Sequence, residues 1–128
     1  MKPMHVVDGL FVSRSRRGGR GVFTAISRQK DELLCYTYSW ELTPGDLAVI
    51  DTTSIEGYWF WHPMKIGWGL LPIGLSALVN CSITPNSVLE WMPSELGCIG
   101  VLRTLQEIEP NEELLIDYGI PLEPGWIS

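Results

Sequence analysis

Two polar segments near the end of the chain carry residue types that could hold a ligand and act on it. Asn80–Asn86 reads Asn-Cys-Ser-Ile-Thr-Pro-Asn, and Glu112–Gly119 contains a tyrosine, Tyr118. A third segment, Gly18–Phe23, is rich in glycine, which lets a backbone approach a ligand closely. If the fold brings them together, these amides, this phenol and this glycine-rich backbone could surround one small polar molecule.

In this order the three segments resemble the SET-domain lysine methyltransferases, in particular the compact members found in bacteria and viruses. Gly19–Phe23 matches the family's Gly-x-Gly-Val-Phe pattern. Asn80–Asn86 agrees at every place but one with Asn-His-Ser-x-x-Pro-Asn, and Tyr118 matches the tyrosine after the last strand. The resemblance covers residues 18–119, about four fifths of the chain. It implies transfer of a methyl group from S-adenosylmethionine to a lysine side chain.

The resemblance also implies which residues hold the cofactor, S-adenosylmethionine. It assigns cofactor binding to Gly19, Arg20 and Gly21, through their backbone, and to Asn80 and Cys81. Cys81 departs from the family pattern, which has histidine at this place. A backbone contact survives the change, whereas a side-chain hydrogen bond from imidazole does not, because a thiol is a weak donor.

For catalysis, the resemblance places Tyr118 beside the methyl group that is transferred. Tyr58 is the second implied catalytic residue, because Tyr58-Trp59-Phe60 matches a Tyr-x-Phe pattern of small family members. The implied lysine channel consists of Tyr58, Phe60, Ile116 and Tyr118. Aromatic walls remove water from a lysine side chain and attract its cation through cation–π interactions. No metal is implied.

Each of these features also has an ordinary structural interpretation. The glycine segment could be a flexible loop, Asn80–Asn86 a polar turn, and Tyr118 a core or interface residue. Tyr58 and its aromatic neighbours could simply fill the core. His5 and His62 have no partner at metal-ligand spacing, so we expect ordinary surface or loop histidines.

The composition is typical of one globular domain. We expect this domain to span residues 1–128, without a pre-SET segment or a zinc-binding post-SET segment. Hydrophobic residues make up 45% and charged residues 19% of the chain, enough for a modest core. Thirteen glycines and nine prolines break long helices and favour short strands. The net charge of -6 argues against nucleic acid as a partner and fits a cationic, lysine-bearing protein tail.

Cysteine usage and hydropathy bear on the compartment. Met1–Pro3 leads directly into sequence of folded type, without a signal peptide. We therefore expect reduced thiols and a cytoplasmic protein, or one in a host nucleus if the chain is viral or a secreted effector. The three cysteines do not have zinc-finger spacing. The longest apolar run, Ile66–Val79, is too short and too interrupted by glycine and proline to span a bilayer, so no membrane is expected.

Short β-prone runs separated by turn signals predict a mostly β domain of several small sheets, with only short helices. The predicted strands are Leu10–Val12, Val22–Thr24, Leu33–Ser39, Leu47–Ile50, Ser87–Trp91, Cys98–Leu102 and Leu114–Ile116. Pro44–Asp46 is predicted as a turn, and Glu109–Glu112 as a turn in which Asn111 adopts the left-handed region. The resemblance adds a SET-like β-clip whose C-terminal segment forms a pseudoknot.

Three functions are compatible with the sequence. The first is an S-adenosylmethionine-dependent protein-lysine N-methyltransferase. The second, favoured by Cys81 and by Ile116 where relatives often have an aromatic residue, is a catalytically weak or inactive SET-like module that binds a peptide or protein. The third is a structural oligomeric β protein with tryptophans at its interface. A homodimer is compatible with the first and the third.

Overall fold

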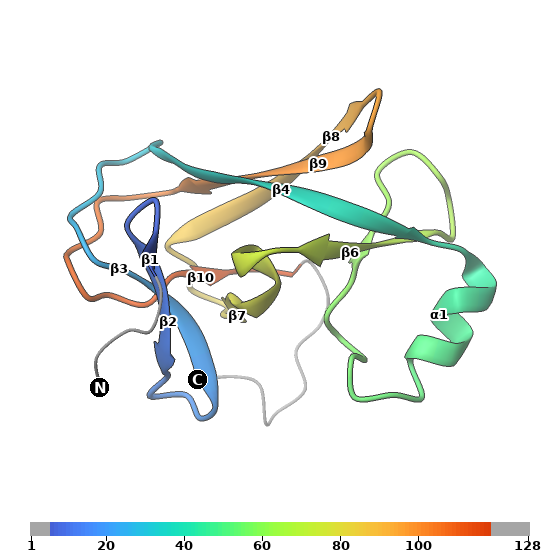
Figure 1. The fold of residues 1–128 in the computed structure, drawn as a ribbon, viewed down its shortest axis with the longest axis horizontal. Coiled ribbons are helices and arrows are strands. Elements are labelled where there is room, and N and C mark those ends of the chain that lie inside the picture. The colour runs from blue at the N-terminus through green and yellow to red at the C-terminus, as the bar shows by residue number, and fades with distance from the viewer. Residues whose placement is uncertain (1–5, 119–128) are drawn as a thin grey trace.

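The structure, a computed structural model, describes residues 6–118. Its strands form three small sheets, as Figure 1 shows. The first is antiparallel and consists of β1 (Val6–Val7), β2 (Leu10–Arg14) and β3 (Arg20–Thr24). The second is also antiparallel and has the order β5 (Phe60–Trp61), β6 (Gly69–Ile73), β4 (Leu33–Leu42), β9 (Gly97–Thr104) and β8 (Ser87–Ser94). The third pairs β7 (Asn80–Cys81) with β10 (Leu115–Ile116).

The mostly β fold and six of the seven predicted strands are confirmed, with boundaries that differ by a few residues. The β8–β9 hairpin closes through two residues between Ser94 and Gly97, and Gly97 takes a φ of 94°. Pro93 is tolerated in β8 because this strand lies at the edge of its sheet. The predicted turn before β10 is also present, with Asn111 at a φ of 67°.

The segment Pro44–Ile50 is a helix, α1, so the predicted turn and strand there were wrong. Thr43 is its N-cap: Thr43 Oγ1 accepts a hydrogen bond from Asp46 N at 3.1 Å, and the Asp46 carboxylate accepts one from Thr43 N at 2.8 Å. This is a capping box. Pro44 occupies the first helical position, where a missing N–H costs nothing. The capping residues therefore outweigh the β propensity of Leu47–Ile50.

Replacing Thr43 by alanine should lower the free energy of unfolding by about 1 kcal/mol, because the Asp46 N–H loses its partner. Urea unfolding of the variant measures this loss. Thr43→Ser is the matched control and should retain most of the stability, since serine keeps the capping oxygen. Equal losses in the two variants would show that the cap is not the cause.

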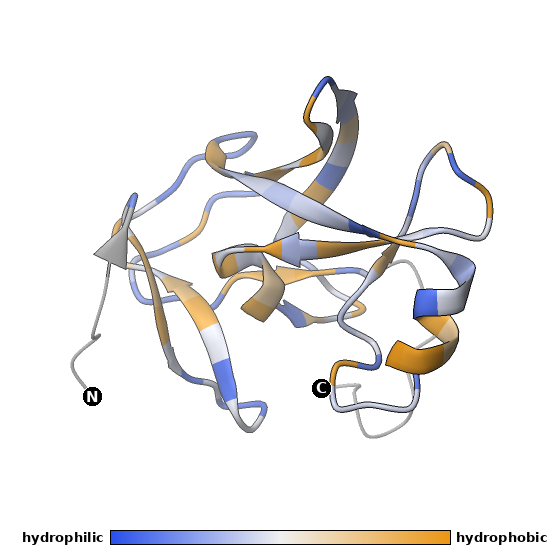
Figure 2. Cartoon of the chain, turned by 45° about the vertical axis from the view of Figure 1, so that its right-hand side comes forward, coloured by the Kyte–Doolittle hydropathy of each residue, from blue (hydrophilic) through white to orange (hydrophobic). Residues whose placement is uncertain are grey.

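The hydrophobic core lies where the sheets meet. Side chains without solvent exposure come from all three sheets and from the loops before β10: Leu10, Leu70, Leu102, Leu114 and Ile116. Figure 2 shows apolar residues, in orange, along strands throughout the fold. Burial of this apolar surface is the main favourable contribution to folding, and it fixes the positions of the three sheets.

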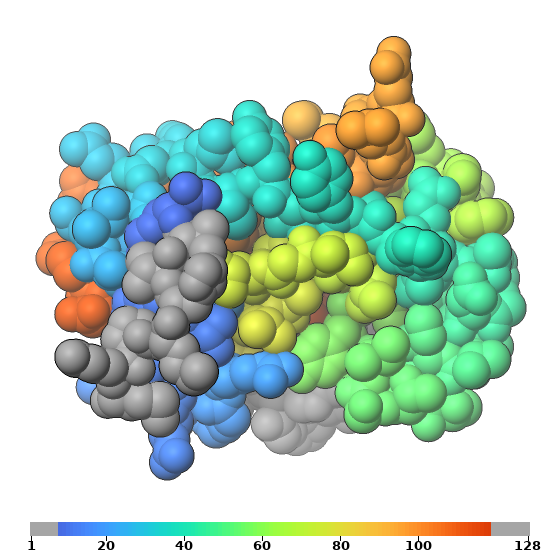
Figure 3. Space-filling model, in the orientation of Figure 1, coloured from blue at the N-terminus to red at the C-terminus, as the bar shows by residue number. Residues whose placement is uncertain are grey.

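The opposite face of the long sheet is exposed and rich in aromatic residues. On β4, Tyr36, Tyr38 and Trp40 are 64%, 60% and 68% exposed. Tyr38 lies beside Ile73 of β6 in the ladder, and Figure 3 shows the side chains of these two strands next to one another. None of the helices among residues 6–118 is long and apolar enough to cross a membrane.

The loop Asn80–Asn86 holds the last strand at two places. β10 runs parallel to β7, at the start of this loop. Ser82 N donates to Ile116 O at 2.9 Å, and Asn86 N donates to Leu115 O at 3.1 Å. The loop therefore wraps around β10, as the predicted pseudoknot requires. The knot brings the two polar segments of the C-terminal third into direct contact.

Candidate functional site

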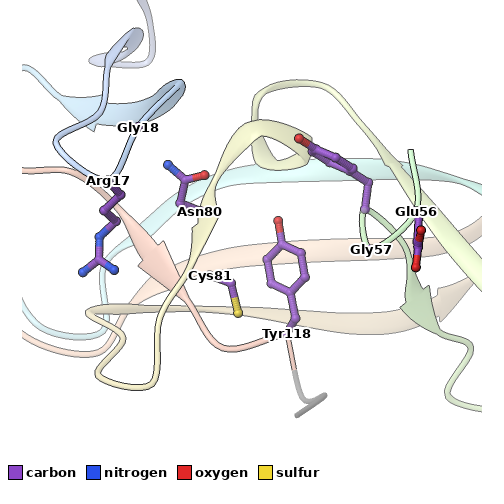
Figure 4. Close-up of a pocket in the computed structure, with 8 residues that line it drawn as sticks. Arg17, Gly18, Glu56, Gly57, Asn80, Cys81 and Tyr118 are labelled. Atoms are coloured by element: carbon purple, nitrogen blue, oxygen red, sulfur yellow. The ribbon is translucent and has the colours of Figure 1, made fainter. Parts of the chain in front are cut away.

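A cavity of about 280 Å³ lies between the β2–β3 turn, the β7 strand and the residues that follow β10 (Figure 4). Its lining residues are Arg17, Gly18, Glu56, Gly57, Tyr58, Asn80, Cys81 and Tyr118. Its volume is close to the lower end of the range of small-molecule sites, roughly 300–1,000 Å³. Four segments far apart in the sequence thus contribute to one site.

Tyr118 presents a neutral phenol to this cavity. Its hydroxyl donates a hydrogen bond to Val79 O at 2.7 Å, and its ring packs against Phe60 with 4.9 Å between centroids. Burial, with smaller contributions from Cys81 and Tyr58, raises the pKa of the Tyr118 phenol far above its ordinary value. The hydroxyl therefore keeps its proton at physiological pH and donates it to Val79 O. The lone pairs of the Tyr118 oxygen remain available to accept hydrogen bonds from other partners.

The amide of Asn80 has a fixed orientation. Its Nδ2 donates to Arg20 O at 3.0 Å and to Glu113 Oε2 at 2.7 Å. Both partners can only accept, so the amide cannot flip without losing both bonds. Figure 4 shows the nitrogen turned toward the β2–β3 turn and Oδ1 turned the other way. The cavity thus receives a hydrogen-bond acceptor from Asn80.

Glu113 joins the β2–β3 turn to the knot. Besides Asn80, its carboxylate accepts a hydrogen bond from the buried Ser15 hydroxyl at 2.7 Å. Ser15 Oγ in turn accepts from Arg17 N at 3.0 Å. Gly21 leaves room for this arrangement, because a Cβ there would collide with the Glu113 carboxylate. Glu113 thereby positions both the turn that carries Arg17 and the amide of Asn80.

Substituting Gly21 by alanine should displace the Glu113 carboxylate and break its bonds to Ser15 and Asn80. We expect a loss of about 2 kcal/mol in the free energy of unfolding, measured with urea. Gly45→Ala is the control: Gly45 lies in the first turn of α1 with its nearest neighbour for a Cβ at 3.7 Å. That change should be neutral or slightly stabilising. Similar destabilisation of both variants would contradict this role of Gly21.

The predicted site residues fall into two groups. Tyr58, Tyr118, Asn80 and Cys81 line the cavity. Five others do not line it: Gly19, Arg20, Gly21, Phe60 and Ile116. Of these, Arg20 contacts Asn80 through its carbonyl, and Ile116 is completely buried in the core. The sequence interpretation missed Arg17, Glu56 and Glu113, because nothing in a sequence distinguishes these charges from ordinary surface charges.

Cys81 carries a protonated thiol at neutral pH. Burial raises the pKa of the Cys81 thiol and outweighs the opposite influence of hydrogen bonds from the Tyr118 and Ser82 backbone and, more weakly, of Arg17. Because only the thiolate is nucleophilic, iodoacetamide should alkylate Cys81 more slowly at pH 7.5 than it alkylates cysteine in a short peptide. The rate should keep rising with pH above the point where the peptide levels off. Peptide mass spectrometry across pH measures this, and fast alkylation of Cys81 at pH 7 would contradict it.

His62 lies in the loop after β5, within the prediction of a surface or loop histidine, but its side chain is buried. Its Nδ1 accepts hydrogen bonds from Met64 N at 3.1 Å and Lys65 N at 3.0 Å. The proton must therefore be on Nε2, which lies 3.1 Å from Glu41 Oε1 and 3.6 Å from Cys98 Sγ. Buried polar nitrogens need hydrogen-bond partners. The turn after β5 supplies the two donors to Nδ1, and Glu41 accepts from Nε2. His5 lies outside the described residues.

Glu41, His62 and Cys98 are the group among residues 6–118 whose atoms are close enough to hold a metal ion, all within 4.8 Å of one another. The hydrogen bonds argue against that use. A metal on Nε2 requires its proton to leave, yet Nδ1 already accepts two backbone N–H bonds and could not carry the proton instead. The arrangement is that of a hydrogen-bonded core histidine.

Comparisons with known proteins agree with this geometry. The family model described as SET domain matches residues 19–119. A Plasmodium falciparum structure described as a candidate histone methyltransferase is 22% identical, with a TM-score of 0.71 over 88% of this chain and 99% of that chain. Two structures of Polycomb Repressive Complex 2 are 17% identical over 89% of this chain, which corresponds to 15% of theirs. The one from Chaetomium thermophilum with the inhibitor GSK126 has a TM-score of 0.73, and the other, bound to S-adenosylmethionine, 0.72.

These identities show a shared fold rather than a shared activity. No curated protein matches the sequence.

Proposed function

The chain belongs to the SET-domain family, and we propose that it is an S-adenosylmethionine-dependent protein-lysine N-methyltransferase. One observation carries the proposal: Asn80, Cys81, Tyr58 and Tyr118 come from three separate segments and line one cavity. These are residues to which the family pattern gives cofactor and catalytic roles. A structural protein would have no need to keep such a cavity open at this place.

The lining suits the chemistry of S-adenosylmethionine. This molecule carries a carboxylate, an ammonium, a sulfonium and a purine base. The cavity offers a cation in Arg17, an anion in Glu56, the acceptor Asn80 Oδ1 and two phenols. Asn80 and Cys81 would hold the cofactor together with the backbone at Gly18, the lining residue next to the family's glycine pattern.

The proposed mechanism is displacement at carbon by a lysine amine. When bound, S-adenosylmethionine supplies a methyl group activated by a sulfonium. Tyr118 orients the reaction: its hydroxyl donates to Val79 O, so the negative end of the phenol dipole is free to face positive charge in the cavity. Alignment of the reacting groups contributes part of the roughly 7–11 kcal/mol that positioning can supply.

The incoming lysine must be neutral to attack. An unperturbed lysine has a pKa of about 10.4. The rings of Tyr58 and Tyr118 exclude water, and removal from water lowers the pKa of an amine, as does a neighbouring positive charge. No side chain in the lining needs to act as a general base, because an amine whose pKa is lowered in this way can release its proton to water as it enters the site. The substrate is therefore a protein or peptide with an accessible lysine.

Methyl transfer can be tested by incubating the protein with radiolabelled S-adenosylmethionine and histone tails or other lysine-rich proteins. Label should enter lysine, and a peptide in which arginine replaces that lysine should stay unlabelled. Calorimetry with the unlabelled cofactor tests the binding step separately. Absence of binding at millimolar cofactor would rule out the proposal.

The second candidate is a SET-like module that binds a peptide without transferring methyl groups. It is favoured by the protonated Cys81 thiol, which gives the cavity only a weak hydrogen-bond donor. Its signature would be peptide binding that Tyr118→Phe leaves unchanged, with no methyl transfer in the unmodified protein.

A further inference from the structure

The outer face of the long sheet carries a group of apolar side chains away from the cavity. Tyr36, Tyr38 and Trp40 point to the same side of β4, because successive residues of a strand alternate between its two faces. The ladder places Ile73 and Leu71 of β6 opposite Tyr38 and Trp40, on that same side. Figure 3 shows the side chains of these two strands next to one another. We call these five residues the aromatic patch.

The fold covers this face of the sheet only at the end next to α1. Leu42 and Gly69 form a pair in the same ladder as the patch and lie on the same side of the sheet. A Cβ at Gly69 would collide with Leu47 of α1 and with Trp59, and Leu42 is buried. The cover ends there, because Trp40, two residues before Leu42, is exposed. No described element covers the aromatic residues of the patch.

The patch is large for a chain of this size. An aromatic side chain has roughly 150–250 Å² of surface, so three that are about two thirds exposed present roughly 300–500 Å². Ile73 is half exposed and adds to this area. The largest apolar patch on a typical monomer is roughly 300–600 Å² and is often functional. A standard interface buries about 800 Å² on each partner, as an apolar core within a polar rim. The patch can therefore supply the core of a protein interface.

The strands beside the patch add no unpaired charge to this face. The register places Glu90 of β8 and Arg103 of β9 on the same side of the sheet, where they form an ion pair with each other. Glu41 of β4 lies on the other side, bound to His62 and Lys65. A cationic protein tail therefore finds no free carboxylate on these strands, and an anionic membrane or nucleic acid finds no free cation.

We propose that two copies of this chain associate through the aromatic patch and form a symmetric dimer. In such a dimer the same surface serves on both subunits, so it must be complementary to itself. A flat apolar face without unpaired charge meets this condition. The net charge of -6 opposes contacts between acidic surfaces of two copies, and the uncharged patch avoids that repulsion. Tyrosine and tryptophan are also the residue types that are enriched at interfaces. The inference does not depend on the proposed methyl transfer.

Sedimentation equilibrium of the full chain tests this inference. The unmodified protein should dimerise with a dissociation constant on the order of 1 μM, the weak end for an interface of standard size. Trp40→Glu should raise this constant at least about 100-fold, because two buried carboxylates of like charge then face the interface. Ile66→Glu is the matched control. Ile66 is 99% exposed and lies outside the patch, so the same added charge should change the constant by less than about threefold.

The variants separate loss of the interface from loss of the fold. Trp40 and Tyr38 are exposed, so Trp40→Glu and a second variant, Tyr38→Glu, should both unfold in urea at the same midpoint as the unmodified protein. An unmodified chain that remains monomeric at about 100 times the expected dissociation constant would overturn the proposal, even if that monomer binds another protein through the patch. A dimer that persists in both folded variants would also overturn it, because the two copies would then meet through another surface.

Discussion

Replacing Tyr118 by phenylalanine should lower the rate of methyl transfer about 100- to 1,000-fold, the effect of removing one preorganised polar group from a reacting centre. The affinity for S-adenosylhomocysteine should stay within about threefold, because the phenol contributes orientation and charge stabilisation more than binding. The variant also loses the hydrogen bond to Val79 O, at a cost of about 1 kcal/mol in stability. Single-turnover assays and calorimetry measure the rate and the affinity separately.

Tyr36→Phe is the matched control for this prediction. Tyr36 is 64% exposed on the outer face of β4, so loss of its hydroxyl should change neither rate nor stability. A Tyr118→Phe variant with full methyl transfer would remove Tyr118 from the mechanism. A parallel loss of rate and cofactor affinity would indicate that it acts in binding instead.

The second large effect is expected at Asn86, whose buried side chain closes the knot. Asn86 Nδ2 donates to Glu113 O at 2.8 Å, and Oδ1 accepts from Leu115 N at 2.9 Å. Asn86→Ala leaves both backbone groups without partners. At about 1–3 kcal/mol for each of the two unsatisfied buried groups, the free energy of unfolding should fall by about 2–6 kcal/mol. Urea unfolding followed by tryptophan fluorescence measures the change.

Thr84→Ala is the control for Asn86→Ala. Thr84 lies in the same loop, is exposed, and makes one long hydroxyl contact with Ser82 at 3.3 Å. Its removal should change stability by less than about 0.5 kcal/mol. If Asn86→Ala is as mild as Thr84→Ala, the side chain of Asn86 does not hold the knot.

Local sequence signals predicted most of the strands, because alternation and turn residues act over a few positions. Asn111 is a clear case: its place after Pro110 predicts the left-handed turn that the structure contains. The miss at Leu47–Ile50 came from weighing β propensity above the capping signal of Thr43 and Asp46. The parallel pairing of β7 with β10 has no local signal and was not predicted; the family resemblance implied only the pseudoknot to which this pairing belongs.

The site was predictable only where a motif marked it. Asn80 and Tyr118 belong to recognisable patterns and line the cavity. The structure gives a further reason for a glycine at position 21: a side chain there would collide with the carboxylate of Glu113, which comes from the other end of the chain. No sequence signal indicated this contact. Arg17 and Glu56 line the cavity because the loops that carry them pack next to it. His62 is buried because the surrounding chain covers it. Such tertiary contacts cannot be inferred from residue types at short range.

The central claim is that one cavity, bounded by the glycine turn, the knot and Tyr118, binds S-adenosylmethionine. A crystal structure with S-adenosylhomocysteine tests it most directly. The ligand should lie between Gly18 and Tyr58, with its sulfur facing the Tyr118 hydroxyl. Two results from a crystal soaked in excess S-adenosylhomocysteine would contradict the account: the ligand bound at another place, or no ligand bound although this cavity is open to solvent.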